Sequence, residues 1–287
     1  MIKLPPPVYQ FDQVFSTCLE GLDKKPKFKA RLSAGKADID AQLDLYSEKA
    51  PIGELYTLEP FVKEHGPDPI IVSDLKKSEF LNLYEVHLRG KEKPGRVIYE
   101  KLLASANGSC PYCGGIGRPR NLDHYLPKSK FPQFSLFPKN LVPACRDCNM
   151  DGKGQGFSAS AGKQIIHPFL DAEHFFQEQW IFGTYDPSDE PTGSVNFYAD
   201  PPLHWSEVDQ ERAKTHFKDF ELGVRYAKEA GSRLISLREQ LDKLADLGIS
   251  SDEISKVLLR PMVDHAPHVN HWERVMGKAV IETMNDG

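Results

Sequence analysis

Cys110-Pro-Tyr-Cys113 and Cys145-Arg-Asp-Cys148 are two CxxC pairs separated by 31 residues. Each pair can form a tight turn whose two thiolates converge, and two such turns complete a tetrahedral Zn²⁺ shell with Zn–S distances near 2.3 Å. One pair alone could be a redox motif, but two pairs strongly indicate a metal site. Four cysteines leave no open coordination position, so we expect a structural Zn²⁺; disulfides or buried thiols are the alternative. The fifth cysteine, Cys18, reads as an ordinary helical residue.

The segment between and after the pairs predicts a small ββα unit. Residues 122–126 read as a short strand, residues 141–144 as its partner, and Arg146 begins a short helix. Glycines follow at 152, 154 and 156, so this helix should be brief. A unit of this size buries too little apolar surface to fold alone, and a bound zinc would hold it together.

Composition places the chain among ordinary globular proteins. Of its 287 residues, 40% are hydrophobic and 27% are charged. It has no apolar run long enough to span a membrane and no apolar stretch of a secretory signal near its first residues. Five cysteines are too few for a disulfide scaffold. We therefore expect a cytoplasmic protein without a membrane partner.

Charge is distributed unevenly along the chain. The formal net charge is −5, yet residues 85–163 hold 13 Lys and Arg against 6 Asp and Glu. Screening confines an electrostatic field to about 10 Å at moderate salt, so a basic centre can bind a polyanion within an acidic chain. Taken alone, the imbalance fits an idle surface equally well.

The flanks read mainly as helices. Helical spacing of apolar residues predicts helices over 38–49, 76–88, 96–106, 207–230 and 232–247, with a capped start at residues 250–253 of a shorter helix ending before Pro261. Short strands are predicted over 164–170, 177–185 and 194–198. The fold class is thus α+β and predominantly helical. We divide it into a helical region (1–106), the cysteine unit (107–163), and a region of short strands and then helices (164–287).

The central segment resembles the HNH endonucleases, which have the ββα-metal fold. The resemblance covers residues 110–153 and rests on Asp-His-x-x-Pro-Lys-Ser at 123–129, on Asn-Leu-Val-Pro-x-Cys-x-x-Cys-Asn at 140–149, and on a lysine at 153. It implies metal-dependent cleavage of phosphodiester bonds, in DNA more often than RNA, leaving 5′-phosphate and 3′-hydroxyl ends. The layout is also similar to nuclease subunits of bacterial anti-phage systems, some of which act beside an ATPase.

The resemblance also implies roles for individual residues. His124 would be the general base, Asp123 and Asn149 would hold the catalytic Mg²⁺ or Mn²⁺, Asn140 would brace a loop, and Lys153 matches a lysine frequent in the family. Members with asparagine at the position of Asn149, among them the HNH domains of RNA-guided CRISPR nucleases, use it as a metal ligand.

Elementary chemistry supports this assignment independently of the family. A neutral imidazole suits proton removal from water near neutral pH. Mg²⁺ prefers few protein ligands, all oxygens, with phosphate and water completing its shell. Asp123 and His124 are adjacent, so a regular strand would direct them to opposite faces, and both can face one ion only if the strand ends or bulges there. Lys153 would share the helix face of Asn149.

Other conspicuous residues fit structural explanations better. Phe131, Phe134 and Phe137 should cover the small core rather than stack on bases. The histidines at 265, 268 and 271 have no cysteine near them, and His167 reads as a packed residue, although a strand could carry it to the site. The basic residues could follow a nucleic-acid backbone; they are Arg118, Arg120, Lys128, Lys130 and Arg146.

The sequence therefore predicts a metal-dependent endonuclease acting on DNA, in bacterial defence, with an ATPase as a candidate partner. Two rivals remain. One is a zinc-stabilised module that binds nucleic acid without cutting it, and the other is an assembly protein in which Asp123 and His124 merely pack.

Overall fold

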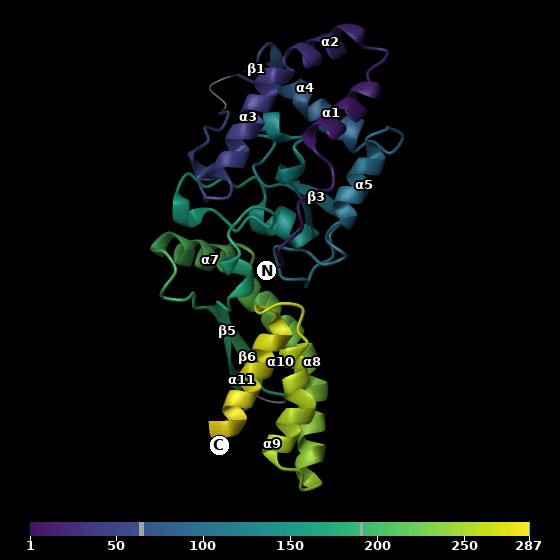
Figure 1. The fold of residues 1–287 in the computed structure, drawn as a ribbon. Helices are drawn as coiled ribbons and strands as arrows, with labels where there is room; N and C mark the ends of the chain where they lie inside the picture. The colour runs from purple at the N-terminus through teal and green to yellow at the C-terminus, as the bar shows by residue number, and fades with distance from the viewer. Residues whose placement is uncertain (63–65, 190–191, 287) are drawn as a thin grey trace.

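The computed structural model describes residues 1–62, 66–189 and 192–286. They form an α+β fold that is rich in helix and has three two-stranded antiparallel sheets within this described part (Figure 1). The predicted α+β class is confirmed. No helix among the described residues is both long enough and apolar enough to cross a membrane.

The N-terminal elements lie at one end of the molecule (Figure 1). Helix α3 shows why the spacing predicted it, since Ile39, Leu43 and Tyr46 form its buried stripe. A π-helix, η3, continues directly from α4. The elements are α1 (Phe11–Glu20), α2 (Pro26–Ala34), α3 (Lys36–Lys49), η1 (Leu55–Thr57), β1 (Ile70–Val72), β2 (Leu75–Lys76), α4 (Lys77–Asn82), η3 (Leu83–Leu88) and α5 (Arg96–Ala104).

The central elements are short. Strands β3 (Asn121–His124) and β4 (Leu141–Ala144) pair antiparallel, with Asn121 opposite Ala144 and His124 opposite Leu141. The predicted strand pair is therefore present, although β3 ends two residues early. The loop between them carries the 3-10 turns η4 (Pro132–Phe134) and η5 (Pro138–Asn140), and the chain continues into the π-helix η6 (Asp147–Lys153) and the turn η7 (Ala161–Lys163).

The C-terminal elements lie at the other end of the molecule (Figure 1). Strands β5 (Ile181–Asp186) and β6 (Ser194–Ala199) pair in register, and α8 and α11 pack against them. The capped start predicted at Ser250 is confirmed, since Ser250 and Glu253 form a capping box. The helices are α6 (His174–Gln177), α7 (Glu207–Asp219), α8 (Leu222–Asp246), α9 (Ser251–Ile254), η8 (Ser255–Leu259), α10 (Arg260–Asp264) and α11 (Trp272–Asp286).

Three helix boundaries in this region differ from the prediction. No break separates the helices expected over 207–230 and 232–247, because α8 runs without interruption from Leu222 to Asp246. The helix expected over 207–230 breaks at Glu221, whose positive φ of 50° separates α7 from α8. The helical segment also does not end before Pro261, because the chain passes from the π-helix η8 directly into α10, which holds this proline in its first turn.

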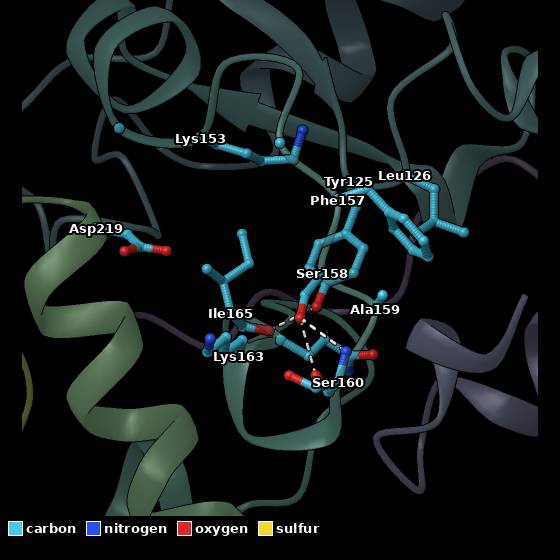
Figure 2. Close-up of a pocket in the computed structure, with 13 residues that line it drawn as sticks. Tyr125, Leu126, Lys153, Phe157, Ser158, Ala159, Ser160, Lys163, Ile165 and Asp219 are labelled. Carbon is cyan, nitrogen blue, oxygen red and sulfur yellow. Dashed lines mark hydrogen bonds between the residues drawn. The ribbon is translucent and has the colours of Figure 1, made fainter. Parts of the chain in front are cut away.

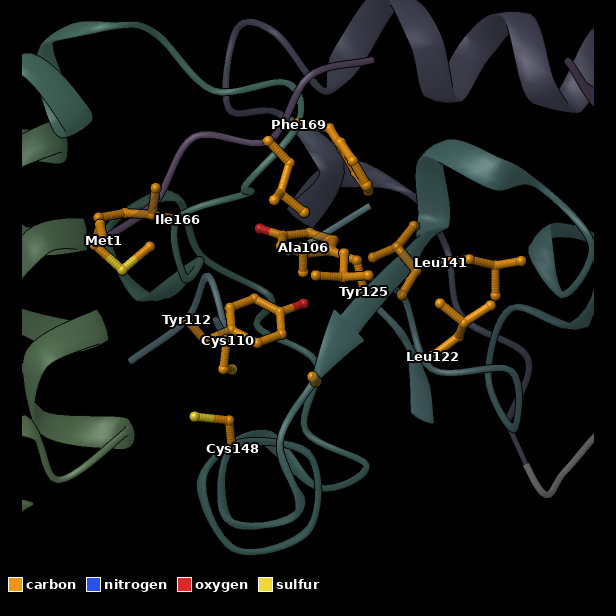
Figure 3. Close-up of a cluster of buried hydrophobic side chains, with 14 of the residues drawn as sticks. Met1, Ala106, Cys110, Tyr112, Leu122, Tyr125, Leu141, Cys148, Ile166 and Phe169 are labelled. Carbon is orange, nitrogen blue, oxygen red and sulfur yellow. The ribbon is translucent and has the colours of Figure 1, made fainter. Parts of the chain in front are cut away.

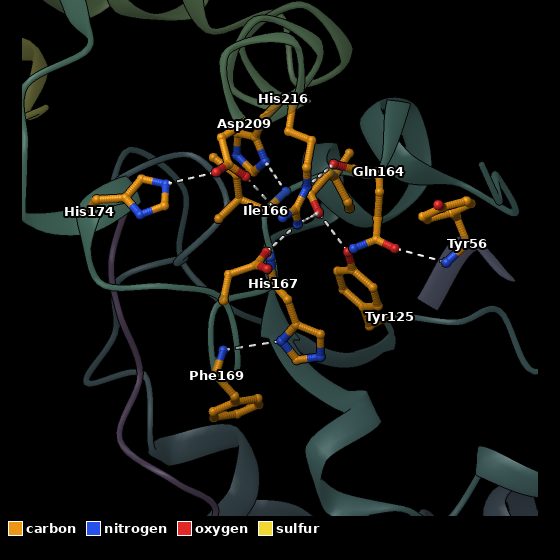
Figure 4. A network of polar contacts seen from close by, with 12 residues as sticks. Tyr56, Tyr125, Gln164, Ile166, His167, Phe169, His174, Asp209 and His216 are labelled. Carbon is orange, nitrogen blue, oxygen red and sulfur yellow. Dashed lines mark hydrogen bonds and ion pairs between the residues drawn. The ribbon is translucent and has the colours of Figure 1, made fainter. Parts of the chain in front are cut away.

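The strand expected over 164–170 is absent, because buried side chains satisfy the backbone of this segment (Figure 4). Arg212 donates to the carbonyls of Gln164 and Ile165 at 3.0 and 3.2 Å. The amide of Ile166 donates to Nδ1 of His216 at 3.2 Å. Backbone groups that would pair with a neighbouring strand thus have partners from α7 instead.

The interior forms one contiguous cluster of buried side chains that reaches from α1 to α11. Figure 3 shows its centre, where Met1 lies next to Ile166, Tyr112 lies beside Cys110, and Leu122 and Leu141 come from the strand pair. The phenylalanines at 131, 134 and 137 are buried in it, as predicted. Cys18 is also buried, on α1. The strand pair and the cysteines are therefore anchored in the main core.

Two buried histidines are held in the neutral form. Nδ1 of His167 accepts from the amide of Phe169, and Nδ1 of His216 accepts from the amide of Ile166. Their Nε2 atoms lie within hydrogen-bond distance of the Tyr46 hydroxyl and the Tyr112 carbonyl. Burial lowers the pKa of each ring to about 3.

The low pKa values of these two histidines predict that the folded protein loses stability in acid. The unfolded chain binds a proton on each imidazole below pH 6.5, whereas the folded chain binds none until about pH 3. Their contribution is complete above pH 6.5 and disappears as the pH falls. At pH 5 we expect each to reduce the free energy of unfolding by about 2 kcal/mol.

The measurement is urea unfolding at pH 7 and pH 5 for the natural protein and for His167→Asn, whose side-chain oxygen can still accept from Phe169. The difference between the two pH values should shrink by about 2 kcal/mol in the variant. An unchanged difference would show that His167 is charged in the folded protein.

Candidate functional site

The four cysteines of the two CxxC pairs meet in a buried cluster. Their Sγ atoms all lie within 4.8 Å of one another, and none forms a disulfide. A tetrahedral zinc with bonds near 2.3 Å needs sulfur atoms about 3.8 Å apart, which this spacing accommodates. The cluster could therefore hold a metal such as zinc.

Backbone geometry around the cluster suits metal-bound thiolates. The amide of Gly117 donates to Cys113 Sγ at 3.2 Å, and the amide of Cys145 donates to Cys110 Sγ at 3.4 Å. A Cβ atom at Gly117 would lie 2.5 Å from the sulfur of Cys145, so a larger residue would not fit there. Gly115 adopts a φ of +100°, which the first turn requires.

The C-terminal region also contacts the cluster. Arg225 of α8 donates to Cys148 Sγ at 3.2 Å and to Cys145 Sγ at 3.8 Å, and it pairs with Asp147 at 3.6 Å. Its guanidinium would partly neutralise a four-thiolate centre. This contact joins residues 77 and 80 positions apart.

Strand β3 brings Asp123 and His124 to one cavity. The strand is regular but ends at His124, and both residues border a cavity of about 220 Å³. Asn149 and Lys153 of η6 border the same cavity. Four of the five residues that the motif indicated therefore share one cavity. The complete lining is Tyr84, Arg89, Asn121, Leu122, Asp123, His124, Pro127, Lys128, Ser129, Asn149, Lys153, Gly154 and Gln155.

Asp123 is buried among polar partners. Lys153 Nζ lies 3.2 Å from each of its carboxylate oxygens, and the Tyr112 hydroxyl donates to Oδ2 at 3.3 Å. Burial raises the pKa of Asp123, against the effect of Lys153 and Tyr112. Lys153 Nζ also donates to the carbonyl of His124 at 2.6 Å. With its side chain 4% exposed, Lys153 is packed rather than frayed.

His124 is fixed in one orientation. Its Nε2 lies 3.1 Å from the carbonyl of Ser135, which can only accept, so Nε2 carries the proton and Nδ1 the lone pair. The ring packs edge-on against Tyr84 with centroids 4.3 Å apart. Burial, together with the nearby ammonium groups of Lys128 and Lys153, lowers the pKa of His124 to about 3. The ring is therefore neutral at pH 7.

The helix that carries Asn149 and Lys153 is a π-helix. Its wider turn appears in the hydrogen bond from Gly154 N to Asn149 O, which spans five residues. Single π-turns occur frequently at functional sites. The expected α-helical spacing is therefore replaced by a wider one, and both residues still line the cavity.

Asn140 does not border the cavity but holds the loop that follows β3. Its Nδ2 donates to the carbonyls of Leu126 and Phe134, and its Oδ1 accepts from the amide of Leu126 at 2.7 Å and from the Tyr46 hydroxyl at 3.1 Å. The Tyr46 hydroxyl in turn meets His167 Nε2. The contacts of Asn140 are of the bracing kind that the resemblance implies, and His167 lies behind it in the core.

Several residues of the cavity were not foreseen from the sequence. Tyr84 and Arg89 come from η3 and the residue after it, far from the motif, and no local pattern marks them. Tyr112, which contacts Asp123 but does not line the cavity, could have been noticed only as the aromatic residue inside the first CxxC pair. Among the three distant histidines, His268 Nε2 contacts the carbonyl of Gly114 at 3.0 Å, next to a cysteine.

Comparison with known proteins adds a family. The chain is 35% identical over 288 residues to protein ea31 of Escherichia phage lambda, and the match covers 96% of this chain and 95% of ea31. A shorter match, 34% identical over 74 residues, links it to the Septu protein PtuB of Bacillus thuringiensis and covers 24% of this chain and 28% of PtuB. No family model and no solved structure matches.

The fold and the site define an α+β protein with a four-cysteine centre that could hold a metal. Because the likeness to ea31 extends over nearly the whole of both chains, the chain belongs to the ea31 family.

Proposed function

We propose that this protein is an HNH endonuclease that uses a divalent metal ion to hydrolyse phosphodiester bonds in DNA. The observation that carries the proposal is the meeting of Asp123, His124, Asn149 and Lys153 in one cavity between β3 and η6. The spacing of the motif in the sequence leaves this convergence open, because two of these residues are adjacent on a strand.

The four-cysteine cluster is the proposed structural zinc site. It leaves no coordination position for a substrate, and its sulfur atoms are buried. Its role is to fix the ends of β4 and η6 relative to the first cysteine pair, and hence to hold Asn149 opposite Asp123.

The donors at the cavity fit a hard divalent cation. Asp123 and Asn149 would hold Mg²⁺ or Mn²⁺, which takes few protein oxygens and keeps several waters. Asn121 also lines this cavity, and its Oδ1 atom has no hydrogen-bond partner among the described residues. When bound, the cation would neutralise charge on the phosphate and on the leaving oxygen. In this structure the ammonium group of Lys153 balances the charge of the Asp123 carboxylate.

His124 is the proposed general base. Its neutral ring and its unprotonated Nδ1 can accept a proton from water, while the Ser135 carbonyl holds Nε2–H and thereby the ring orientation.

Two further cations border the cavity and would contact the phosphates beside the cleaved bond. Arg89 pairs with Glu85 at 2.8 Å, and Lys128 pairs with the other oxygen of Glu85. Lys128 also lies over the Tyr84 ring, 4.8 Å from its centroid. Glu85 therefore holds both cations at the cavity and partly offsets their charge.

We expect Arg89→Gln and Lys128→Gln each to weaken DNA binding and to reduce the slope of log K against log salt by about 1, because each removes one phosphate contact. Glu85→Gln should strengthen binding, since it frees both cations. Fluorescence anisotropy between about 50 and 200 mM salt measures all three. Arg238→Gln, on the exposed surface of α8, is the matched control. If the slope of log K against log salt is the same for these variants as for the natural protein, these residues do not contact the DNA.

The function is tested with purified zinc-loaded protein and supercoiled plasmid, single-stranded DNA and RNA as substrates. Cleavage is expected with Mg²⁺ or Mn²⁺ and should stop when a chelator removes them. Binding without cleavage of any substrate would favour the non-cutting nucleic-acid-binding module. Absence of both nucleic-acid and divalent-ion binding would favour the assembly protein.

We also infer a role in anti-phage defence, with an ATPase as partner subunit. What supports it is the short likeness to a protein with a defence-related name, Septu protein PtuB. Co-expression with an ATPase encoded beside this chain should give a joint peak in size-exclusion chromatography, and separate elution would contradict the partnership.

A further inference from the structure

A second, larger cavity also has Lys153 in its lining (Figure 2). Its volume is about 480 Å³, within the range of small-ligand sites, whereas the cavity at His124 has about 220 Å³. Lys153 borders both cavities. Its ammonium group contacts Asp123 and the His124 carbonyl at the smaller one.

The walls of the larger cavity are suited to a flat aromatic ring. Phe157 and Tyr125 line it together with the aliphatic side chains of Leu126 and Ile165. Phe157 is itself supported edge-on by Phe131, with centroids 4.7 Å apart. Such walls offer stacking and dispersion contacts to a base of any identity.

Polar groups at the cavity suit the edge of a base. Asp219, the last residue of α7, and Lys163 border it, and neither side chain makes an ion pair or hydrogen bond with a residue that the structure describes. They offer one acceptor and one donor. In Figure 2 Lys153 lies at one end of this space and the serines at 158 and 160 at the other.

We propose that this larger cavity binds one unstacked base of the nucleic acid, belonging to a nucleotide next to the phosphodiester held at His124. The inference rests on the proposed nuclease function, because the position of Lys153 between the cavities is what relates the base to the cleaved phosphate. A single-stranded or locally unpaired segment is then the preferred substrate, since a base must leave its stack to enter.

The test measures binding rather than cleavage. The full-length His124→Ala protein is titrated with a fluorescent single-stranded DNA, and with a series in which each nucleotide in turn is abasic. We expect one abasic position to weaken binding about 10-fold or more, as the loss of a stacked base does. When Phe157→Ala is added to this protein, the intact strand should bind about as weakly as the abasic strand binds without that substitution. The abasic position should then cause no further loss of affinity.

A second variant guards against misfolding. Ala159→Leu adds bulk at an exposed residue of the cavity. With this variant, the abasic position should no longer weaken binding more than the other positions do. Tyr198→Ala, on the exposed surface of β6, is the matched control and should keep it. Equal losses at every abasic position, or an undiminished loss in both cavity variants, would overturn the proposal. If the strand binds with these signatures but the natural protein cuts nothing, only the nuclease function fails.

Discussion

Cys148→Ser is expected to prevent the protein from holding its metal and to unfold the region around it. Structural zinc sites contribute about 10–16 kcal/mol, whereas whole domains are stable by only about 5–15 kcal/mol. The cysteines belong to the main core, in the same buried cluster as Tyr112 and the strand pair, so the loss should extend beyond the two turns. Circular dichroism should show loss of the cooperative thermal transition.

Metal content by mass spectrometry should fall from about one zinc per chain in the natural protein to none in the variant. Cys18→Ala is the matched control, because Cys18 is equally buried but lies on α1, away from the cluster. It should keep its zinc and lose only about 1 kcal/mol. Full stability of the metal-free Cys148→Ser protein would refute the structural role of the cluster.

His124→Ala is expected to reduce the cleavage rate about 10²- to 10⁴-fold, the usual contribution of a general base. The fold should persist, because the variant retains the zinc ligands and the strand pairing. A plasmid-nicking time course with Mg²⁺ measures the rate. Thermal unfolding and zinc content show whether the protein is otherwise intact.

His265→Ala is the matched control, since His265 is exposed at the end of α10 and far along the chain from the motif. It should cut at the natural rate. Equal cleavage by His124→Ala and the natural protein would end the assignment of His124, and cleavage that survives a chelator would exclude the proposed metal.

The sequence was informative where chemistry and spacing are local. The CxxC pairs predicted a four-sulfur cluster, and the short apolar segments at 122–126 and 141–144 predicted the strand pair that β3 and β4 form. Apolar spacing predicted α3 because Ile39, Leu43 and Tyr46 recur at helical intervals. These features depend on residues within a few positions of one another or on distinctive ligands.

Prediction was weaker where side chains replace regular pairing. Residues 164–167 have the composition of a strand, yet Arg212 and His216, about 50 positions later, satisfy their backbone. The break at Glu221 depends on one residue with a left-handed backbone, which glutamate gives no reason to expect. The domain division and the catalytic roles stay predictions.

By itself, the sequence determined the four-cysteine cluster, the short strand pair and the order of the motif residues. Only the tertiary structure decided that Asp123 and His124 border the same cavity as Asn149 and Lys153, and that Arg225 reaches the cysteine cluster from α8. It also placed Glu85 between Arg89 and Lys128, the two cations that border this cavity. The physical reason is that ligand spacing and apolar periodicity are written into neighbouring residues, whereas burial, charge balance and a shared cavity arise from segments that meet only when the chain folds.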